Sequence, residues 1–255
     1  MIDPELPRQP SRRDLSFRVR DWFAWAPERE SQKAWRAWAG QGEVDAPDAT
    51  MPTLPMMLRR RVTPVGQKAL GAALACSGVG EARYVLASRH GEFDRTMTIL
   101  ASLAENEQPS PAEFSMSVHH GLAGLLSIHT GNKAGHTAVA GSLDSFGYGL
   151  LEAASCLAEA PSVPVLLIYF DPPLPEDYAP FRPIAEAELP LALAMTLTAS
   201  EGDAVCVSTT IADGEAERPE NLPQNLPLSF LRFLLGNEPA ATVRGGRMVW
   251  RWHRA

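Results

Sequence analysis

The sequence predicts a layered α/β fold, and three observations support this prediction. Segments with a helical period alternate with short apolar runs of strand length. One such run, 163–170 (VPVLLIYF), is apolar throughout, which is typical of a strand buried on both faces of a sheet. The chain has 255 residues, 45% of them hydrophobic, which is enough for a continuous core.

The first two thirds of the chain carry most of the alternation. Thr63-Pro64 and Ser110-Pro111 each combine a capping side chain with a first-turn proline, and each is expected to start a helix. Segment 42–55 is a linker by composition. We expect strands at 15–26, 81–88, 137–140 and 163–170, and helices at 28–40, 65–75, 94–105, 112–128 and 145–159.

The last third begins with a proline-rich crossing at 171–190, whose six prolines disfavour helices and sheet ladders. Strands at 191–200 and 204–211 are expected to form a hairpin through 201–203. A helix at 226–235 follows, and a hairpin around Gly245-Gly246 is expected to end the chain.

Composition excludes several functional classes. The formal net charge of -7 argues against non-specific nucleic-acid binding, and no apolar run approaches the ~18 residues of a membrane span. The N-terminal arginines lack the apolar core of a signal peptide, so a cytoplasmic location is expected. Cys76, Cys156 and Cys206 each lie in an apolar segment and are expected to be buried free thiols.

The common cofactor and metal motifs are absent. The glycine-rich passages match neither the phosphate loop nor the dinucleotide fingerprint, and the histidines lack metal-ligand spacing, so neither a cofactor nor a metal is expected. The sequence around Ser145 is an incomplete G-x-S-x-G elbow. Arg59, Arg60 and Arg61 form the densest positive run, which is either a solvated surface or a grip for a phosphate or an acidic partner.

Two segments carry a family resemblance. Residues 114–129 (FSMSVHHGLAGLLSIH) resemble the S-x-x-N-x-x-A-G helix of β-ketoacyl synthases, the condensing enzymes of fatty acid and polyketide synthesis. Residues 137–153 (TAVAGSLDSFGYGLLEA) resemble their T-x-x-x-A-C-x-S-G nucleophile segment. The likeness is best over about 80–170. It implies a single domain over 1–255 with a truncated thiolase-like, or ketosynthase-like, layered fold, a mixed sheet and an abbreviated second half over 191–255.

This resemblance places Leu143 where the synthases have their nucleophilic cysteine, with Ser142, Asp144 and Ser145 completing a vestigial elbow. A leucine side chain has no lone pair to attack a thioester. No block similar to the family's H-G-T-G-T histidine motif follows Ala153. The resemblance therefore implies a subunit that is not an enzyme.

Further likenesses lie at 88–95 (SRHGEFDR), 165–176 (VLLIYFDPPLPE) and 249–252 (VWRW), and they are similar to the small synthase-like chain length factors found beside aryl polyene pigment genes. The resemblance implies an inactive subunit that forms a heterodimer with an active ketosynthase in type II polyketide synthesis and helps to limit product length. An acyl carrier protein would dock mainly on the ketosynthase. The candidate tunnel and interface residues are Thr96, Met97, Leu100, Leu103, His119 and His120.

Other interpretations stay open at this point. Core packing explains the helical stripe of Met97, Leu100 and Leu103 equally well, and His119 and His120 suit either a buried hydrogen-bonded site or a cleft. The chain is alternatively an independent acyl hydrolase or transferase that uses Ser142 or Ser145 with a histidine base. A third interpretation is a stand-alone acyl-binding or scaffold protein.

Overall fold

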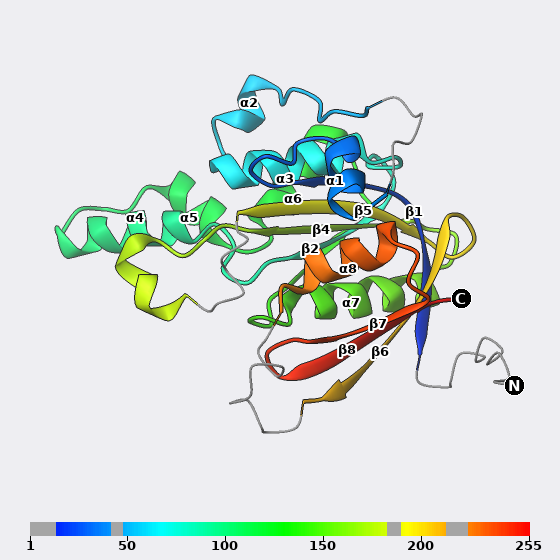
Figure 1. Ribbon diagram of the computed structural model, residues 1–255. Helices are drawn as coiled ribbons and strands as arrows, with labels where there is room; N and C mark the ends of the chain where they lie inside the picture. The colour runs from blue at the N-terminus through cyan, green and yellow to red at the C-terminus, as the bar shows by residue number, and fades with distance from the viewer. Residues whose placement is uncertain (1–13, 42–47, 183–189, 213–223) are drawn as a thin grey trace, which may run out of the picture.

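The computed structural model describes residues 14–41, 48–182, 190–212 and 224–255. Within them, one mixed sheet of eight strands runs in the order β3-β2-β4-β5-β1-β6-β8-β7 (Figure 1). Only the β2–β3 and β2–β4 pairs are parallel. The strands are β1 (Leu15–Trp25), β2 (Arg83–Ala87), β3 (His136–Val139), β4 (Val165–Asp171), β5 (Leu191–Thr198), β6 (Asp203–Ile211), β7 (Ala240–Arg244) and β8 (Met248–Arg254). The predicted α/β class with a mixed sheet is confirmed.

Helices cover both faces of this sheet. Helices α3 and α6 pack on one face, and α7 and α8 pack on the other (Figure 1). The helices are α1 (Gln32–Trp38), α2 (Met56–Arg59), α3 (Pro64–Ala75), α4 (Phe93–Ala104), α5 (Pro111–Ser117), α6 (Gly121–Thr130), α7 (Ser145–Glu159), α8 (Leu226–Leu235) and the 3₁₀ helix η1 (Glu176–Phe181). Because both faces are covered, the central strands β4 and β5 are buried along their whole length.

The predicted caps are present. The Thr63 side chain accepts a hydrogen bond from the backbone N–H of Gly66, and the Ser110 side chain accepts one from Glu113. Cys76, Cys156 and Cys206 are buried and free, as expected. In the described parts of the chain, no helix combines the length and apolar character that a membrane span requires.

The predicted hairpin between 191–200 and 204–211 is wrong, because β1 lies between β5 and β6. The connecting turn crosses the β1 backbone closely. Gly202 has a φ of +108°, and a Cβ there would overlap the carbonyl group of Val19. The period-2 pattern identified both strands, but it could not show that a strand from the start of the chain separates them.

Three other expectations need correction. The helix expected at 112–128 is two helices, α5 and α6, because Val118 adopts an extended conformation between them. Helix α2 follows the expected linker, of which 42–47 lie outside the described residues. The proline-rich crossing contains η1, although residues 183–189 are not described. The terminal hairpin of β7 and β8 is confirmed.

Candidate functional site

Three segments meet at the carboxyl end of the parallel strands. They are the 88–92 turn after β2, the 140–145 turn after β3, and the segment that begins with Asp171 at the end of β4. Carboxyl ends of neighbouring parallel strands lie at one edge of a sheet, which is where α/β proteins usually bind ligands. The elbow expected from the sequence lies at this edge.

The 141–145 turn has a tight, strained backbone. Ser142 is exposed and has a φ of +55°, which is rare for a residue other than glycine. The Ser145 hydroxyl is buried, donates to the Ser142 carbonyl at 2.6 Å and accepts from the Gly141 N–H at 2.9 Å. Ser145 therefore holds the turn together, and its hydroxyl is committed to backbone groups.

Asp144 links this turn to the end of the chain. Its buried carboxylate accepts hydrogen bonds from the Trp250 indole N–H at 2.7 Å and from the Arg247 backbone N–H at 2.6 Å. Trp250 lies on β8, and Arg247 lies in the tip between β7 and β8. Leu143 is half-buried beside this tip, because a Cβ on Gly246 would lie 3.3 Å from the Leu143 Cβ. The terminal hairpin thus rests on the elbow.

No cysteine lies in this turn. Cys76 is at the end of α3, Cys156 is near the end of α7 and Cys206 is on β6. Burial raises the pKa of all three thiols, most strongly that of Cys76. Because the thiolate is the nucleophilic form, these cysteines are poor nucleophiles.

The end of β2 is joined to the end of β4 by a buried ion pair. Arg89 Nε lies 2.9 Å from Asp171 Oδ2, and the two side chains are only 5% and 3% exposed. The Tyr169 hydroxyl donates to the same carboxylate at 3.2 Å. Loss of either charge would break this buried ion pair, which is strongly destabilising.

Glu92 fixes the base of α4. Its buried carboxylate accepts hydrogen bonds from the Thr63 backbone N–H, the Thr63 hydroxyl and Arg95 Nε at 3.1, 2.6 and 3.0 Å. Arg95 also binds Glu113 of α5 at 2.7 Å. Polar contacts thus connect α4 to the cap of α3 and to α5. The family resemblance includes the 88–95 segment but predicts none of these contacts. In the sequence, the feature that could have indicated them is a set of charged residues directly after a strand.

The two candidate histidines differ in burial and in the groups that they contact. The His119 ring packs against Gly91, and its buried Nε2 has no hydrogen-bond partner among the described residues. His120 is exposed and stacks on His136 of β3, with ring centroids 6.0 Å apart. Within the described chain, no hydrogen bond connects either histidine to Ser142 or Ser145. The described residues therefore show no hydrogen-bonded pair of a serine and a histidine at the elbow.

A third histidine, His90, is half-buried next to His119. Burial lowers the pKa of His90 to about 4, and the neighbouring Arg89 and His119 charges add to this effect. His90 is consequently a neutral imidazole at neutral pH.

The expected tunnel stripe lies on an exposed helix. Helix α4 contains no buried residue, Thr96 and Met97 are half-buried, and Leu100 and Leu103 are 49% and 53% exposed. Figure 1 shows α4 and α5 projecting together from the sheet, and we call them the α4–α5 hairpin. Phe114 on α5 is 64% exposed. Packing within the described chain therefore does not account for the stripe.

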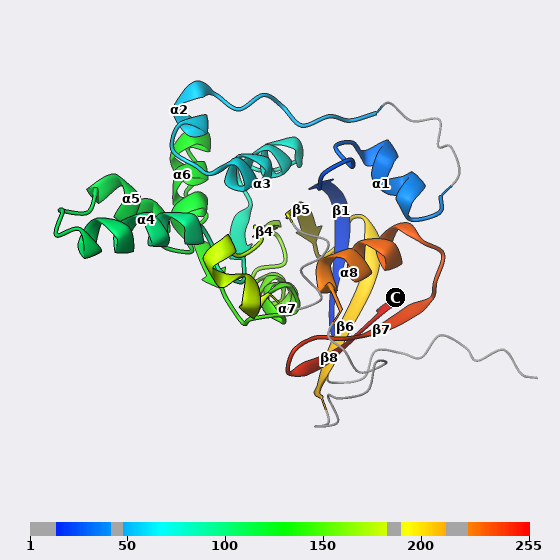
Figure 2. The same ribbon diagram turned by 60° about the vertical axis from the view of Figure 1, so that its left-hand side comes forward.

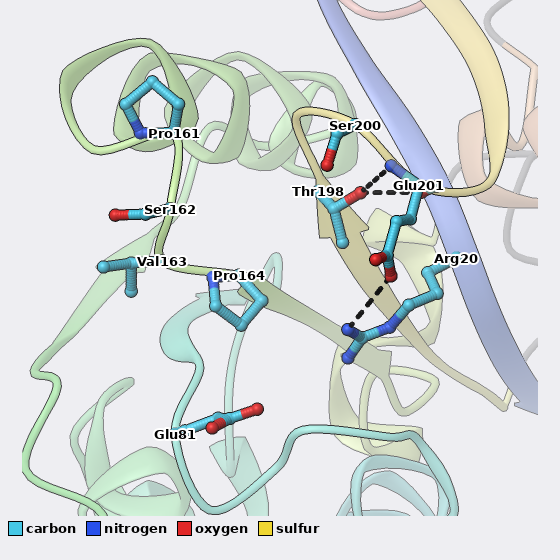
Figure 3. A pocket seen from close by; sticks show the side chains of 9 residues that line it. All are labelled: Arg20, Glu81, Pro161, Ser162, Val163, Pro164, Thr198, Ser200 and Glu201. Carbon is cyan, nitrogen blue, oxygen red and sulfur yellow. Dashed lines mark hydrogen bonds and ion pairs between the residues drawn. The ribbon is translucent and has the colours of Figure 1, made fainter.

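Two surface pockets lie away from the elbow. The pocket in Figure 3, of about 390 Å³, lies beside Glu81 and Pro164, near the amino ends of β2 and β4 and so opposite the elbow. Another, of about 530 Å³, lies between α3 and the 48–59 segment. Among the residues that the structure describes, no three potential ligands from His, Cys, Asp and Glu converge as a metal site.

Comparisons with known proteins agree with this architecture. A chain in the complex of the ketosynthase ApeO with its chain length factor ApeC from Xenorhabdus doucetiae is 28% identical, with a TM-score of 0.77; the match covers 94% of this chain and 100% of that chain. The ishigamide ketosynthase/chain length factor is 15% identical (TM-score 0.57; 79% and 68% covered). The AntDE:AntF complex is 11% identical (TM-score 0.56; 84% and 71% covered). The last two show a shared fold.

The search among curated proteins finds no match. The family model described as the N-terminal domain of β-ketoacyl synthase matches residues 35–253, which is most of the chain. Together with the thiolase-like fold of the ketosynthases, this match identifies the chain as a member of the β-ketoacyl synthase family.

Proposed function

We propose that this chain is a catalytically inactive chain length factor, which pairs with an active ketosynthase and shapes the acyl tunnel in type II polyketide biosynthesis of the aryl polyene kind, in the cytoplasm. The observation that carries the proposal is the match to the Xenorhabdus complex, which covers that chain completely. A matched chain of similar length fits a reduced subunit better than a complete two-half condensing enzyme.

The start of α7 supports inactivity. The resemblance to the synthases implies that Leu143 takes the nucleophile position, and a leucine side chain offers no atom that could form an acyl thioester. The three thiols of the chain are buried elsewhere. Ser145, the other nearby candidate, has its hydroxyl hydrogen-bonded to the backbone on both sides.

The α4–α5 hairpin supports a partner contact. Leu100, Leu103 and Phe114 are large apolar side chains left at least 49% exposed on one projecting unit. Exposed apolar clusters of this kind mark interaction sites. We assign the tunnel wall to Thr96, Met97, Leu100 and Leu103, which the ketosynthase would cover.

The heterodimer interface would extend to the outer edge of the sheet. Among the described strands, β3 lies at the edge of the sheet, and Ile128 of the neighbouring α6 is 81% exposed. His119 and His120 lie at the start of α6, and His120 contacts β3 through His136. An edge strand beside an exposed apolar side chain suits a subunit interface.

The alternative function, an independent serine- or histidine-dependent acyl hydrolase or transferase, has less support. It requires a base near Ser142 or Ser145, and the described structure shows no such hydrogen bond. A stand-alone acyl-binding scaffold would leave the exposed apolar hairpin without a partner.

Co-expression with a candidate partner ketosynthase tests the proposal. We expect stable co-purification and condensing activity that is lost when the partner's nucleophilic cysteine is replaced, but retained in Ser142→Ala. Leu100→Ala should lengthen the product and Leu100→Trp should shorten it. Ile211→Ala is the matched control, because Ile211 is 80% exposed at the end of β6, on a strand far from β3 in the sheet order.

Turnover of acyl thioesters by the isolated chain would overturn the proposal in favour of the hydrolase. Failure to associate with the ketosynthase would favour the scaffold. Unchanged product lengths for variants at all four wall positions would refute the tunnel assignment.

A further inference from the structure

A pocket of about 390 Å³ lies at the amino ends of β2 and β4, at the opposite end of these strands from the elbow (Figure 3). Four segments line it: Arg20 of β1, Glu81 in the turn before β2, residues 161–164 before β4, and residues 198–201 after β5. We call it the Arg20 pocket. Its volume is large enough for a small organic molecule.

The backbone of β1 directs Arg20 to this pocket. Val19 pairs with Leu197 of β5 and Asp21 pairs with the next residue along β5, so Arg20 is the extra residue of a β-bulge. Bulges change the direction of a side chain and are frequent beside functional sites. Opposite Arg20, Gly78 has a φ of +74°, and a Cβ there would lie only 2.7 Å from Arg20 Nη2. A bulge on one side and a glycine on the other thus accommodate the guanidinium group.

The Arg20 guanidinium has donors to spare. Its Nε is buried and makes no hydrogen bond among the described residues. Its ion pairs with Asp21 and Glu201 are both 3.9 Å long, which is longer than a hydrogen bond. The Asp21 carboxylate instead accepts hydrogen bonds from the backbone N–H and the hydroxyl of Ser77. A planar guanidinium with free N–H groups is suited to bind a carboxylate through two parallel hydrogen bonds.

The other charges of the pocket are negative. Figure 3 shows Glu81 and Glu201 on either side of Arg20, and both carboxylates belong to exposed residues. Among the residues that the structure describes, Glu81 forms no ion pair. A simple anion would be attracted by Arg20 but repelled by two carboxylates, and a simple cation would be repelled by Arg20. A ligand that carries both charges finds a partner for each of them.

The remaining lining is polar on one side and apolar on the other. Ser162 and Ser200 contribute hydroxyl groups. The Thr198 hydroxyl donates to the Glu201 carbonyl at 2.6 Å and accepts from the Glu201 N–H at 2.9 Å, so it fixes the turn that carries Glu201. The 161–164 segment adds two prolines and a valine, which can contact an aliphatic group.

We propose that the Arg20 pocket binds a small zwitterion of the α-amino acid class, with its carboxylate on Arg20 and its ammonium group on Glu81. The ligand's side chain lies against the 161–164 segment. This inference goes beyond the proposed function, because the pocket shares no residue with the elbow or with the α4–α5 hairpin. Since the ligand bridges β1 and the segments before β2 and β4, its binding stabilises the folded chain.

The test is a calorimetric titration of the full chain with L-leucine at pH 7 and constant ionic strength. Two analogues each lack one charge: L-leucinamide has no carboxylate, and N-acetyl-L-leucine has no ammonium group. Inorganic phosphate is the probe for a simple anion. We expect saturable binding of L-leucine, and at least tenfold weaker binding of the two analogues and of phosphate. Saturating L-leucine should also raise the urea midpoint of unfolding.

Variants assign the two charges. Arg20→Gln should weaken L-leucine binding at least tenfold and remove its advantage over L-leucinamide. Glu81→Gln should remove the advantage over N-acetyl-L-leucine, and because Glu81 is exposed, this variant keeps the test valid if Arg20→Gln does not fold. Arg83→Gln is the matched control and should bind L-leucine normally, because Arg83 starts β2 but pairs with Glu159 at 3.5 Å outside the pocket.

The proposal is overturned if the unmodified chain shows no saturable binding of L-leucine, or if both analogues bind as tightly as L-leucine. Tighter binding of phosphate would show a simple anion site and would also overturn it, as would unchanged affinity in both Arg20→Gln and Glu81→Gln. Failure of the proposed function is separately visible in co-purification with the ketosynthase, which none of these titrations measures.

Discussion

Helices α7 and α4 occupy comparable places in the topology but differ in burial. Each follows a strand of the parallel part of the sheet, α7 after β3 and α4 after β2. Nine of the 15 residues of α7 are buried, whereas none of the 12 residues of α4 is. Figure 2 shows the same contrast in space, with α7 under the sheet and α4 out beside α5.

The difference shows that apolar stripes on two helices of the same chain can have different roles. The stripe of α7 packs in the core with β1, β4 and α8, so its apolar character serves folding. The stripe of α4 has no such partner in the described chain, and the helix is attached through Glu92 and Arg95 at its base. An apolar surface held out by a polar anchor is suited to contact with a second chain.

The largest effect on stability should come from truncating a core side chain of the buried helix α7. Leu150→Ala on α7 should lower the free energy of unfolding by about 3 kcal/mol, because Leu150 is fully buried and its loss leaves a cavity. Leu100→Ala on α4 should change it by less than about 0.5 kcal/mol. Urea denaturation of the isolated chain measures both. Equal losses would mean that α4 contributes to the core after all.

A smaller loss of stability is expected when the polar contacts at the base of α4 are removed. Glu92→Gln removes the charge that pairs with Arg95 and should cost about 2 kcal/mol. Hydrogen exchange should also become faster across α4 and leave α7 unchanged. Glu105→Gln, at the exposed end of α4, is the control. Unchanged exchange in α4 would show that the polar anchor does not hold the helix.

His90, in the turn before α4, should make the stability of the protein depend on pH. The pKa of His90 is about 4 in the folded protein and near 6.5 when unfolded. The unfolded chain binds more protons between these values, so stability should fall as the pH drops from 6.5 to 4. His90→Gln should weaken this fall in urea titrations at several pH values, whereas substitution of the exposed His129 at the end of α6, His129→Gln, should not. The same slope in both variants would contradict the buried neutral imidazole.

The smallest effect on turnover is expected for the arginines at the end of α2. They test whether the carrier protein docks on this chain or on its partner. Arg59, Arg60 and Arg61 are exposed and form no ion pair among the described residues, next to Met57 at 76% exposure. If the carrier protein docks mainly on the ketosynthase, reversing all three charges to Glu should change carrier-dependent turnover less than twofold. A tenfold loss would show direct docking on this chain.

Much of the local structure was predictable from sequence. Periodicity and caps located β4, α3, α7 and the terminal hairpin, because these signals act within a few residues. The break between α5 and α6 was missed, since nothing in the composition of 112–128 requires Val118 to be extended. At the site, the family resemblance predicts the elbow residues, but Trp250, which donates to Asp144, lies 106 positions away, and no local pattern encodes that contact.

The sequence by itself determined the positions of most helices and strands, the absence of sulphur at position 143, and membership of the condensing-enzyme family. The tertiary structure alone decided that β1 separates β5 from β6, that the α4 stripe faces outward, and that the hairpin closes over the elbow. The physical reason is range: hydrogen bonds within helices and turns join near neighbours, whereas sheet order and burial depend on contacts between distant segments whose free energies only the folded chain combines.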